Sequence, residues 1–305
     1  NRIANENIDN RLNGFFRFSI GLAKKMLIAN QMSILADTIF NIPAGILTMG
    51  QAWLGSLAYA FQIYFDFSGY SDMAIGLGLM MGFRFPENFN APYISQSISE
   101  FWRRWHITLS NWMRDYLYIP IGGNRVKSKV RLYFNLWVVF LISGFWHGAA
   151  WTFIAWGIFH GAFLILDRLF LLRFYKMIGK PLSIIITFII TLVGWVIFRA
   201  ETFPQAMSYI VTMFDFGNMN LAISTTRGTY DWFIEQRFII IFGVASFFSF
   251  LPTINFIEKN MNPFFGTQGE KDFIFIKSIL AIILLYICIT EVISTGINPF
   301  IYYRF

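Results

Sequence analysis

The chain has 305 residues, of which 56% are hydrophobic and 13% are charged. Soluble globular proteins carry about 25% charged residues, so this composition excludes a soluble domain and a disordered chain. Aromatic side chains make up 20% of the residues, and the single cysteine, Cys288, excludes a disulfide-rich module and a cysteine-based metal site. The composition predicts an integral membrane protein.

The formal net charge is +7, from 24 basic and 17 acidic residues. In a membrane protein an excess of Lys and Arg is typical of loops on the cytoplasmic side. The sequence begins at Asn1, without a start methionine, and no charged leader with a cleavage site follows. We therefore expect it to be the later part of a longer protein.

Apolar segments of about 20 residues predict membrane-spanning helices, because the hydrocarbon core of a bilayer is about 30 Å thick. The run 73–83 is too short to cross unless it is tilted or re-entrant. The longer apolar segments, the first of them interrupted by charges, are 15–40, 42–65, 132–166, 181–198, 238–257 and 273–290.

The uncharged stretch 132–166 is too long for one crossing and too short for two, since a straight helix of that length would measure about 52 Å. It contains four glycines at which a helix can bend or pack closely: Gly144, Gly148, Gly157 and Gly161. We expect broken, partly re-entrant helices that line a cavity, because non-helical backbone at membrane depth needs protein or water around it.

Two polar segments interrupt the apolar ones. The segment 85–133 holds most of the concentrated positive charge, and the positive-inside rule assigns it to the cytoplasm. The segment 200–237 is mainly acidic and leaves its side of the membrane open. No internal repeat, low-complexity tract or soluble second domain is present in the sequence.

Two of the three histidines, His147 and His160, lie in the uncharged stretch. Ionisable side chains at membrane depth are costly and are candidates for function. Histidine is also the commonest general base near neutral pH. The alternative for each ring is a neutral imidazole that bonds to backbone in a packed bundle. Gly144 and Gly148 favour function for His147, because they allow a substrate to approach the ring.

The segment 101–116 has the pattern of one amphipathic helix with an aromatic face. The preceding Ser97 and Glu100 form a capping box. Two interpretations of its basic side are open: an interfacial helix that binds anionic headgroups, or a surface on which Arg103 and Arg104 steer a phosphate-bearing donor toward a buried site. In the second interpretation His106 is a second catalytic group.

The segment 64–72 places two carboxylates, Asp66 and Asp72, at the end of an apolar span. With the neighbouring hydroxyls they could hold a cation for transport. Capping of a following helix by Ser71 or Asp72 is the interpretation that we favour. The sequence contains no P-loop, dinucleotide fingerprint, zinc spacing or serine-nucleophile elbow.

Several motifs together resemble those of the membrane-bound O-acyltransferases. Within this family the motifs are most similar to those of the bacterial alginate O-acetylase and peptidoglycan O-acetyltransferase type. The D-alanyl transfer protein of teichoic acid is a more distant relative. The motifs that carry the resemblance lie at 64–76, 101–110, 114–123, 143–149, 195–201 and 298–305.

The resemblance implies an all-α fold: a polytopic transmembrane helical bundle with interfacial and re-entrant helices. Residues 1–305 then form a single membrane domain that lacks its N-terminal spans. It also implies a multi-pass protein of the plasma (cytoplasmic or inner) membrane. His147 matches the catalytic histidine of the family and His106 its second, supporting polar position, whereas His160 follows the family pattern less clearly.

The function implied is O-acetylation of an exported, alginate-like polysaccharide or of peptidoglycan. The acyl donor is a cytoplasmic thioester such as acetyl-CoA, and a periplasmic or extracellular esterase-fold partner passes the acyl group to the acceptor. No bound cofactor and no metal are expected. His147 takes the acceptor proton or helps to form an acyl-enzyme on the partner. The candidate donor-binding residues are Arg103, Arg104, Trp146, Ser143 and Asp66.

Three alternatives stay open at this stage. One is D-alanyl transfer to teichoic acid. Another is a transporter in which Asp66 and Asp72 couple an ion to transport, although the internal symmetry typical of transporters is absent. The last is a scaffold of a polysaccharide export complex, in which His147 would be dispensable.

The orientation of the basic segment is directly testable. We expect single cysteine substitutions at Lys127 and Lys129 to stay unlabelled when an impermeant thiol reagent is added to intact cells. The parent protein, with Cys288 alone, supplies the background, and permeabilised cells show that each site is reactive. Labelling of either site from outside would contradict the cytoplasmic assignment.

Overall fold

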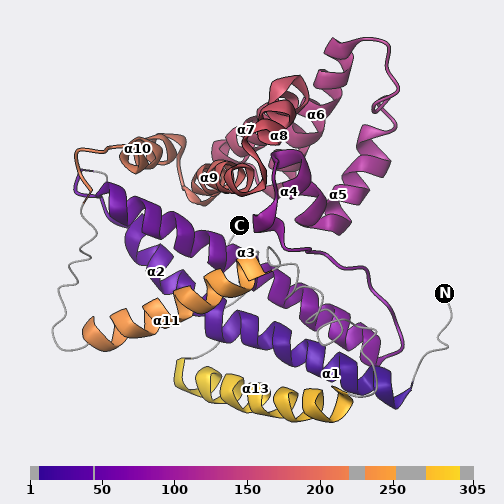
Figure 1. The fold of residues 1–305 in the computed structure, drawn as a ribbon, viewed down its shortest axis with the longest axis vertical. Helices are drawn as coiled ribbons and strands as arrows, with labels where there is room; N and C mark the ends of the chain where they lie inside the picture. Colours follow the sequence, from indigo (N-terminus) through magenta and orange to yellow (C-terminus); the bar gives the residue numbers. More distant parts are fainter. Residues whose placement is uncertain (1–6, 44, 220–230, 252–272, 296–305) are drawn as a thin grey trace. The chain divides into compact units, whose positions relative to one another are not determined.

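The computed structural model describes residues 7–43, 45–219, 231–251 and 273–295. All regular elements in these ranges are helical (Figure 1), so the expected all-α class is confirmed for the part of the chain described. The elements are α1 (Ile8–Ala23), η1 (Lys24–Ala29), α2 (Asn30–Phe40), α3 (Met49–Met80), η2 (Pro92–Ile94), α4 (Ile98–Arg104), α5 (Ile107–Met113), η3 (Arg114–Tyr118), α6 (Lys129–His147), α7 (Trp151–Leu166), η4 (Asp167–Leu171), α8 (Leu172–Ile178), α9 (Lys180–Arg199), α10 (Phe203–Met213), α11 (Asp231–Phe250) and α13 (Ile274–Thr295).

Three described helices are long and apolar enough to cross a membrane: Trp151–Ile178, Lys180–Arg199 and Ile274–Ser294. The second and third coincide with the spans expected at 181–198 and 273–290. The span expected at 238–257 begins within α11, where Gln236–Phe250 forms a shorter apolar helix; its last residues lie outside the described part, as does the motif at 298–305.

The span expected at 42–65 was wrong in its start. Helix α2 ends at Phe40, and α3 begins only at Met49. The residues described between them form turns. The chain therefore reverses within a segment whose lack of charge resembled that of a membrane span.

Helix α3 also runs through the point at which we expected a new helix to begin. Asp72 does not cap a helix; its carboxylate accepts from Lys24 Nζ at 2.6 Å and from Arg17 Nε at 2.7 Å. Ser71 Oγ accepts a hydrogen bond from Asn88 Nδ2 at 3.1 Å. Because these partners satisfy both side chains, α3 continues to Met80 and includes most of the short run 73–83.

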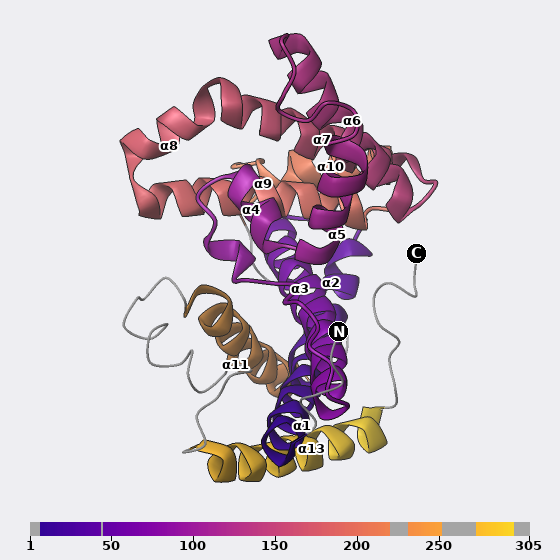
Figure 2. The ribbon, with the colours of Figure 1, turned by 90° about the vertical axis from the view of Figure 1, so that its right-hand side faces the viewer.

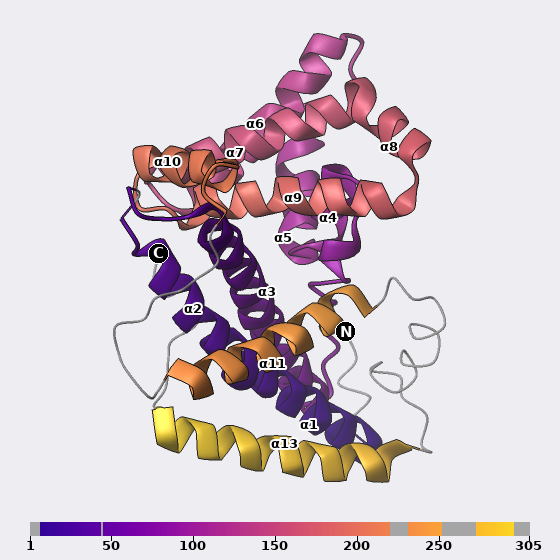
Figure 3. The same cartoon turned by 60° about the vertical axis from the view of Figure 1, so that its left-hand side comes forward.

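The chain divides into two compact units, and α3 contributes to both. The first unit contains the described residues of 1–35, 61–88 and 227–304, and the second contains those of 36–60 and 89–226. In the first, α13 lies alongside α1 (Figures 1 and 3). Two polar contacts hold it there: Lys277 Nζ donates to Asn13 Oδ1 at 3.2 Å, and Gln31 Nε2 donates to Glu291 Oε1 at 2.9 Å.

Backbone contact between glycines brings α1 and α3 together in the first unit. A Cβ atom added to Gly14 would lie 2.6 Å from the oxygen of Gly76, and one on Gly21 would lie 2.5 Å from the oxygen of Gly69. Small residues at such crossings let membrane helices approach closely. Nearby, Lys25 forms a buried ion pair with Asp66.

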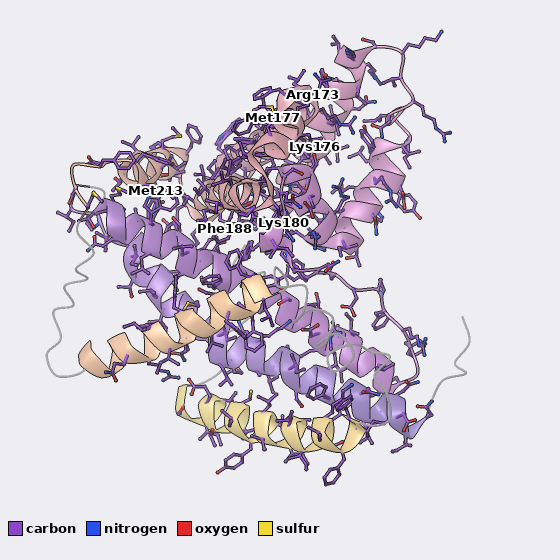
Figure 4. The ribbon with its side chains drawn as sticks, in the orientation of Figure 1. Arg173, Lys176, Met177, Lys180, Phe188 and Met213 are labelled. Atoms are coloured by element: carbon purple, nitrogen blue, oxygen red, sulfur yellow. The ribbon has the colours of Figure 1, made fainter. Side chains whose placement is uncertain are left out.

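The second unit contains an antiparallel pair, α6 and α7, followed by a hairpin in which α8 turns back into α9 (Figure 2). Gly179 makes this turn with φ +82°, a left-handed conformation that favours glycine. Three basic residues surround the turn (Figure 4): Arg173, Lys176 and Lys180.

Helix α10 is fastened to the first part of α3 within the second unit. The indole Nε1 of Trp53 donates to the carbonyl oxygen of Met213 at 2.6 Å. The hydroxyl of Tyr209 donates to the carbonyl oxygen of Ala52 at 2.9 Å. Both donors are thereby satisfied by backbone acceptors.

The glycine contact in the first unit predicts a steric cost for one added methyl group. We expect Gly21→Ala to lower the stability of the detergent-solubilised protein by about 1–3 kcal/mol, because two backbone atoms of α3 would lie within 2.8 Å of the new Cβ. Thermal or denaturant unfolding measures the loss.

The matched control is Gly243→Ala, since a Cβ atom on this helical glycine meets nothing within 4 Å. Alanine favours a helix over glycine, so this variant should keep or raise the stability. Equal stability of Gly21→Ala and wild type would contradict the close contact between α1 and α3.

Candidate functional site

His106 lies at a break that the sequence pattern did not reveal. The single helix expected over 101–116 is wrong: α4 ends at Arg104 and α5 begins at Ile107. His106 stands between them with φ +44°, in the left-handed region that non-glycine residues rarely adopt. Backbone of this kind is found preferentially where a side chain must be aimed. The break therefore presents the His106 ring at the junction of two short helices.

The start of α4 matches its prediction. Ser97 Oγ accepts from the amide of Glu100 at 3.1 Å, and Glu100 Oε2 accepts from the amide of Gln96 at 2.9 Å. The first contact satisfies an amide that a helix N-terminus leaves without a partner. The second goes to Gln96, one residue before the cap, so the cap by Ser97 is confirmed but the return bond of a capping box to the Ser97 amide is replaced by one to Gln96. The cap fixes the start of α4, the helix that precedes His106.

His106 and His147 are brought near one another. Burial, with a smaller contribution from the charge of His147, lowers the pKa of His106 to about 3. His106 is consequently a neutral imidazole at neutral pH. Its Nδ1 lies 3.5 Å from the hydroxyl of Thr108. A neutral ring can accept or donate a hydrogen bond but supplies no positive charge.

His147 is the last residue of α6 and stands against aromatic rings. Its ring meets those of Trp156 and Phe198 edge to face, with centroids 5.2 Å apart in each case. The neighbouring Trp146 is 54% exposed, and its ring lies 5.0 Å from that of His147. The imidazole thus has apolar walls and one flank that remains open.

The expected break in the stretch 132–166 is confirmed at residues 148–150, between α6 and α7. Beyond the turn the two helices touch through backbone: a Cβ on Gly144 would lie 2.4 Å from the oxygen of Phe153, and one on Gly157 would lie 2.4 Å from that of Phe140. This close antiparallel contact places His147, at the end of α6, beside Trp156 on α7.

His160 lies inside the second unit and is 1% exposed. Its Nδ1 accepts a hydrogen bond from Trp102 Nε1 at 3.4 Å. The ring also meets that of Trp156 at 5.0 Å. Trp156 therefore contacts both histidines of the uncharged stretch, one on each side.

The candidate donor-binding residues fall into two groups. Ser143 is buried one turn before His147, and Arg103 is exposed on α4. Arg104 is engaged locally, since it pairs with Glu100 at 2.9 Å and its Nη1 donates to the oxygen of Asn90 at 3.1 Å. Asp66 belongs to the first unit, where Lys25 neutralises it.

Sequence reasoning missed Asp167. Its carboxylate is 1% exposed, and Oδ2 accepts from the amide of Ser99 at 2.8 Å. The bond joins the end of α7 to the first turn of α4, the helix that leads to His106. Its position is the signal that could have identified Asp167 in the sequence, since it is a single acidic residue directly after a long apolar segment.

No group of three or more His, Cys, Asp or Glu side chains suited to a metal ion occurs among the described residues. What the second unit offers is a pair of imidazoles, aromatic walls and an exposed arginine. Such an arrangement can move a proton and hold an acyl group away from water.

Comparison with known proteins identifies the family of this chain. The model of the membrane-bound O-acyltransferase family matches residues 9–200, a range that contains all three histidines. The probable alginate O-acetylase AlgI of Pseudomonas aeruginosa is 53% identical over 215 residues, which cover 70% of this chain and 41% of that protein.

Two further relatives match nearly all of the chain. The probable alginate O-acetylase AlgI of Pseudomonas putida is 42% identical over 307 residues, covering 98% of this chain and 62% of that protein. The peptidoglycan O-acetyltransferase of Helicobacter pylori is 40% identical over 301 residues, covering 96% and 56%. The chain thus spans about half the length of the curated relatives that it matches. It belongs to the membrane-bound O-acyltransferase family.

Proposed function

We propose that the whole protein O-acetylates an exported polysaccharide, alginate-like or peptidoglycan, with an acyl group from a cytoplasmic thioester such as acetyl-CoA. The observation that carries this proposal is the position of His147 at the end of α6, against the buried rings of Trp156 and Phe198. The names of the three relatives all describe O-acetyl transfer, which favours acetyl over D-alanyl transfer. Membership in an acyltransferase family favours an enzyme over a transporter or a scaffold.

The proposed step needs one base and little else, because a thioester is already activated. His147 accepts the proton of the acceptor hydroxyl as its oxygen forms a bond to the acyl carbon. The carbon–sulfur bond then breaks, and the imidazolium returns its proton to the departing thiolate. The same step serves either acceptor, the polysaccharide itself or the hydroxyl of an esterase-fold partner that relays the acetyl group.

His106 has the supporting role in this proposal. Since it is neutral at neutral pH, it holds the acceptor or the His147 ring through a hydrogen bond rather than through charge. The left-handed backbone at His106 aims the ring, and the bond between Asp167 and Ser99 holds the helix that precedes it.

The donor-binding roles follow from exposure. Arg103 presents a charge at the surface and attracts the phosphates of the donor, whereas Trp146 and Ser143 line the approach to His147. For Asp66 a role in donor binding stays a prediction, and its pairing with Lys25 favours a structural one.

We also propose that the protein crosses the cytoplasmic membrane several times, with the basic segment inside and with re-entrant helices around residues 148–150. Arg168 Nη1 donates to Asn124 Oδ1 at 3.0 Å, so the end of α7 lies beside the loop of the basic segment. The exposed basic residues at the α8–α9 turn (Figure 4) fit the same side.

Removal of the imidazole of His147 tests the base. In the full-length protein we expect His147→Ala and His147→Gln each to lower turnover with acetyl-CoA by about 10²–10⁴-fold. Thermal unfolding and expression, measured on the same preparations, should change little, because His147 is at a helix end with one open flank.

A structural role gives a different pattern. A buried partner left unpaired costs about 1–3 kcal/mol, so His147→Ala would lose stability together with activity, and the amide of His147→Gln would restore both. Wild-type turnover in a folded His147→Ala protein would remove the centre of the proposal.

Salt dependence tests Arg103. We expect Arg103→Gln to reduce kcat/KM for acetyl-CoA by about two- to five-fold at low ionic strength, the size of an exposed charge interaction, and by less at high ionic strength, where salt already screens the attraction. Steady-state kinetics at two salt concentrations measure both values.

Arg173→Gln is the matched control, since it removes the same charge from an exposed position on α8. It should leave kcat/KM unchanged at both salt concentrations. A loss in Arg103→Gln that is equal at every salt concentration would argue for packing or hydrogen bonding in place of attraction.

A further inference from the structure

Three buried ring N–H groups gather in the second unit, in what we call the donor cluster: Trp156, His160 and Trp195. Each side chain is 1% exposed. The ring of Trp156 lies 5.0 Å from that of His160 and is stacked at 6.5 Å on that of Trp195. Helix α7 supplies the first two residues and α9 supplies the third, so the packing of these helices creates the cluster.

None of the three N–H groups has an acceptor among the described residues. The atoms concerned are Trp156 Nε1, His160 Nε2 and Trp195 Nε1. For His160 the proton is on Nε2, because Nδ1 accepts from Trp102. Buried polar groups in folded proteins are nearly always paired. Three unpaired donors on rings that meet at Trp156 are therefore the features of a site whose partner comes from outside the chain.

Other indoles of the same unit show that the fold does pair such groups. Trp53 Nε1 donates to a backbone oxygen at 2.6 Å, and Trp102 Nε1 donates to the His160 ring. The unpaired indoles are thus concentrated at one place, against α7 and α9.

The donor cluster adjoins the proposed base, and a glycine packs against it. The ring of Trp156 touches that of His147, with centroids 5.2 Å apart. A Cβ atom on Gly194 would lie 2.7 Å from Nε2 of His160. A larger residue at 194 would clash with this N–H, whereas glycine lets α9 pack beside it.

We propose that the donor cluster binds the carbonyl oxygen of the acyl thioester; this inference rests on the proposed function. A thioester oxygen only accepts hydrogen bonds and an indole only donates them, so the two are complementary. When the oxygen of the acceptor hydroxyl attacks the acyl carbon, the π electrons of the carbonyl group move onto the carbonyl oxygen. They return to the carbonyl bond as the carbon–sulfur bond breaks. Fixed donors in a site without water stabilise that transient negative charge.

The experiment removes one N–H at a time and keeps an aromatic ring at the position. In the full-length protein, Trp156→Phe and Trp195→Phe are compared with wild type for acetyl-CoA turnover. Binding is compared for acetyl-CoA and for S-ethyl-CoA, a thioether that lacks only the carbonyl oxygen. We expect wild type to prefer acetyl-CoA. Each variant should lose that preference, with kcat lower by about 10²–10³-fold, the usual effect of one lost oxyanion donor.

Stability separates these variants from a variant that loses a paired indole. Without ligand the indole N–H is an unpaired buried donor, so its removal should offset part of the cost of the cavity left by the smaller ring, and thermal stability should fall little. Trp53→Phe is the matched control: it deprives a backbone oxygen of its partner, and it should lower stability without any change in the preference for acetyl-CoA over S-ethyl-CoA.

Two results would overturn the inference. One is equal binding of acetyl-CoA and S-ethyl-CoA by wild type. The other is an unchanged preference and unchanged kcat in both folded Phe variants, which would assign the N–H groups to water. Failure of the proposed function is separate: an active His147→Ala protein would refute the base, whereas an inactive one that still prefers acetyl-CoA would support the donor cluster.

Discussion

The contact between α6 and α7 is the constraint on which the candidate site depends. Gly144 and Gly157 let the two backbones touch, so that Trp156 stands beside His147 although α6 and α7 are separate helices. A side chain at either glycine would force the helices apart by the thickness of a methyl group or more. The ring contact from Trp156 on α7 to His147 on α6 would then loosen.

Around this contact the protein places polar groups in an apolar setting in two ways. In the first unit, charged side chains form ion pairs with one another, as Lys25 does with Asp66. In the second unit, His106 is kept neutral by burial, and the donor cluster presents uncharged N–H groups. Uncharged donors cost less to bury than ions. Such donors also interact most strongly with the substrate when negative charge develops on it during the reaction.

The sequence allowed prediction wherever the deciding interaction was local. The cap at Ser97 depends on residues three and four positions apart, and the break near Gly148 on a stretch too long for one crossing. The prediction failed where a distant partner decided: Asp72 was expected to cap a helix, but its partners Arg17 and Lys24 lie 55 and 48 positions away. The break at His106 could not be predicted, because no residue type or spacing in the sequence indicates that a histidine adopts the left-handed backbone conformation.

The glycine pairs between α1 and α3 leave an ambiguity that the ion pairs resolve. Gly14 and Gly21 are seven residues apart, as are Gly69 and Gly76, so a slide of one helix by two turns would bring one glycine pair back into contact. That slide would carry Asp66 about 10 Å from Lys25 and would separate Asp72 from at least one of its two cations, Arg17 and Lys24. Stripping a buried ion of its counterion costs about 3–5 kcal/mol. The salt bridges therefore act as a register lock, which selects one of two alignments that the small residues alone would tolerate.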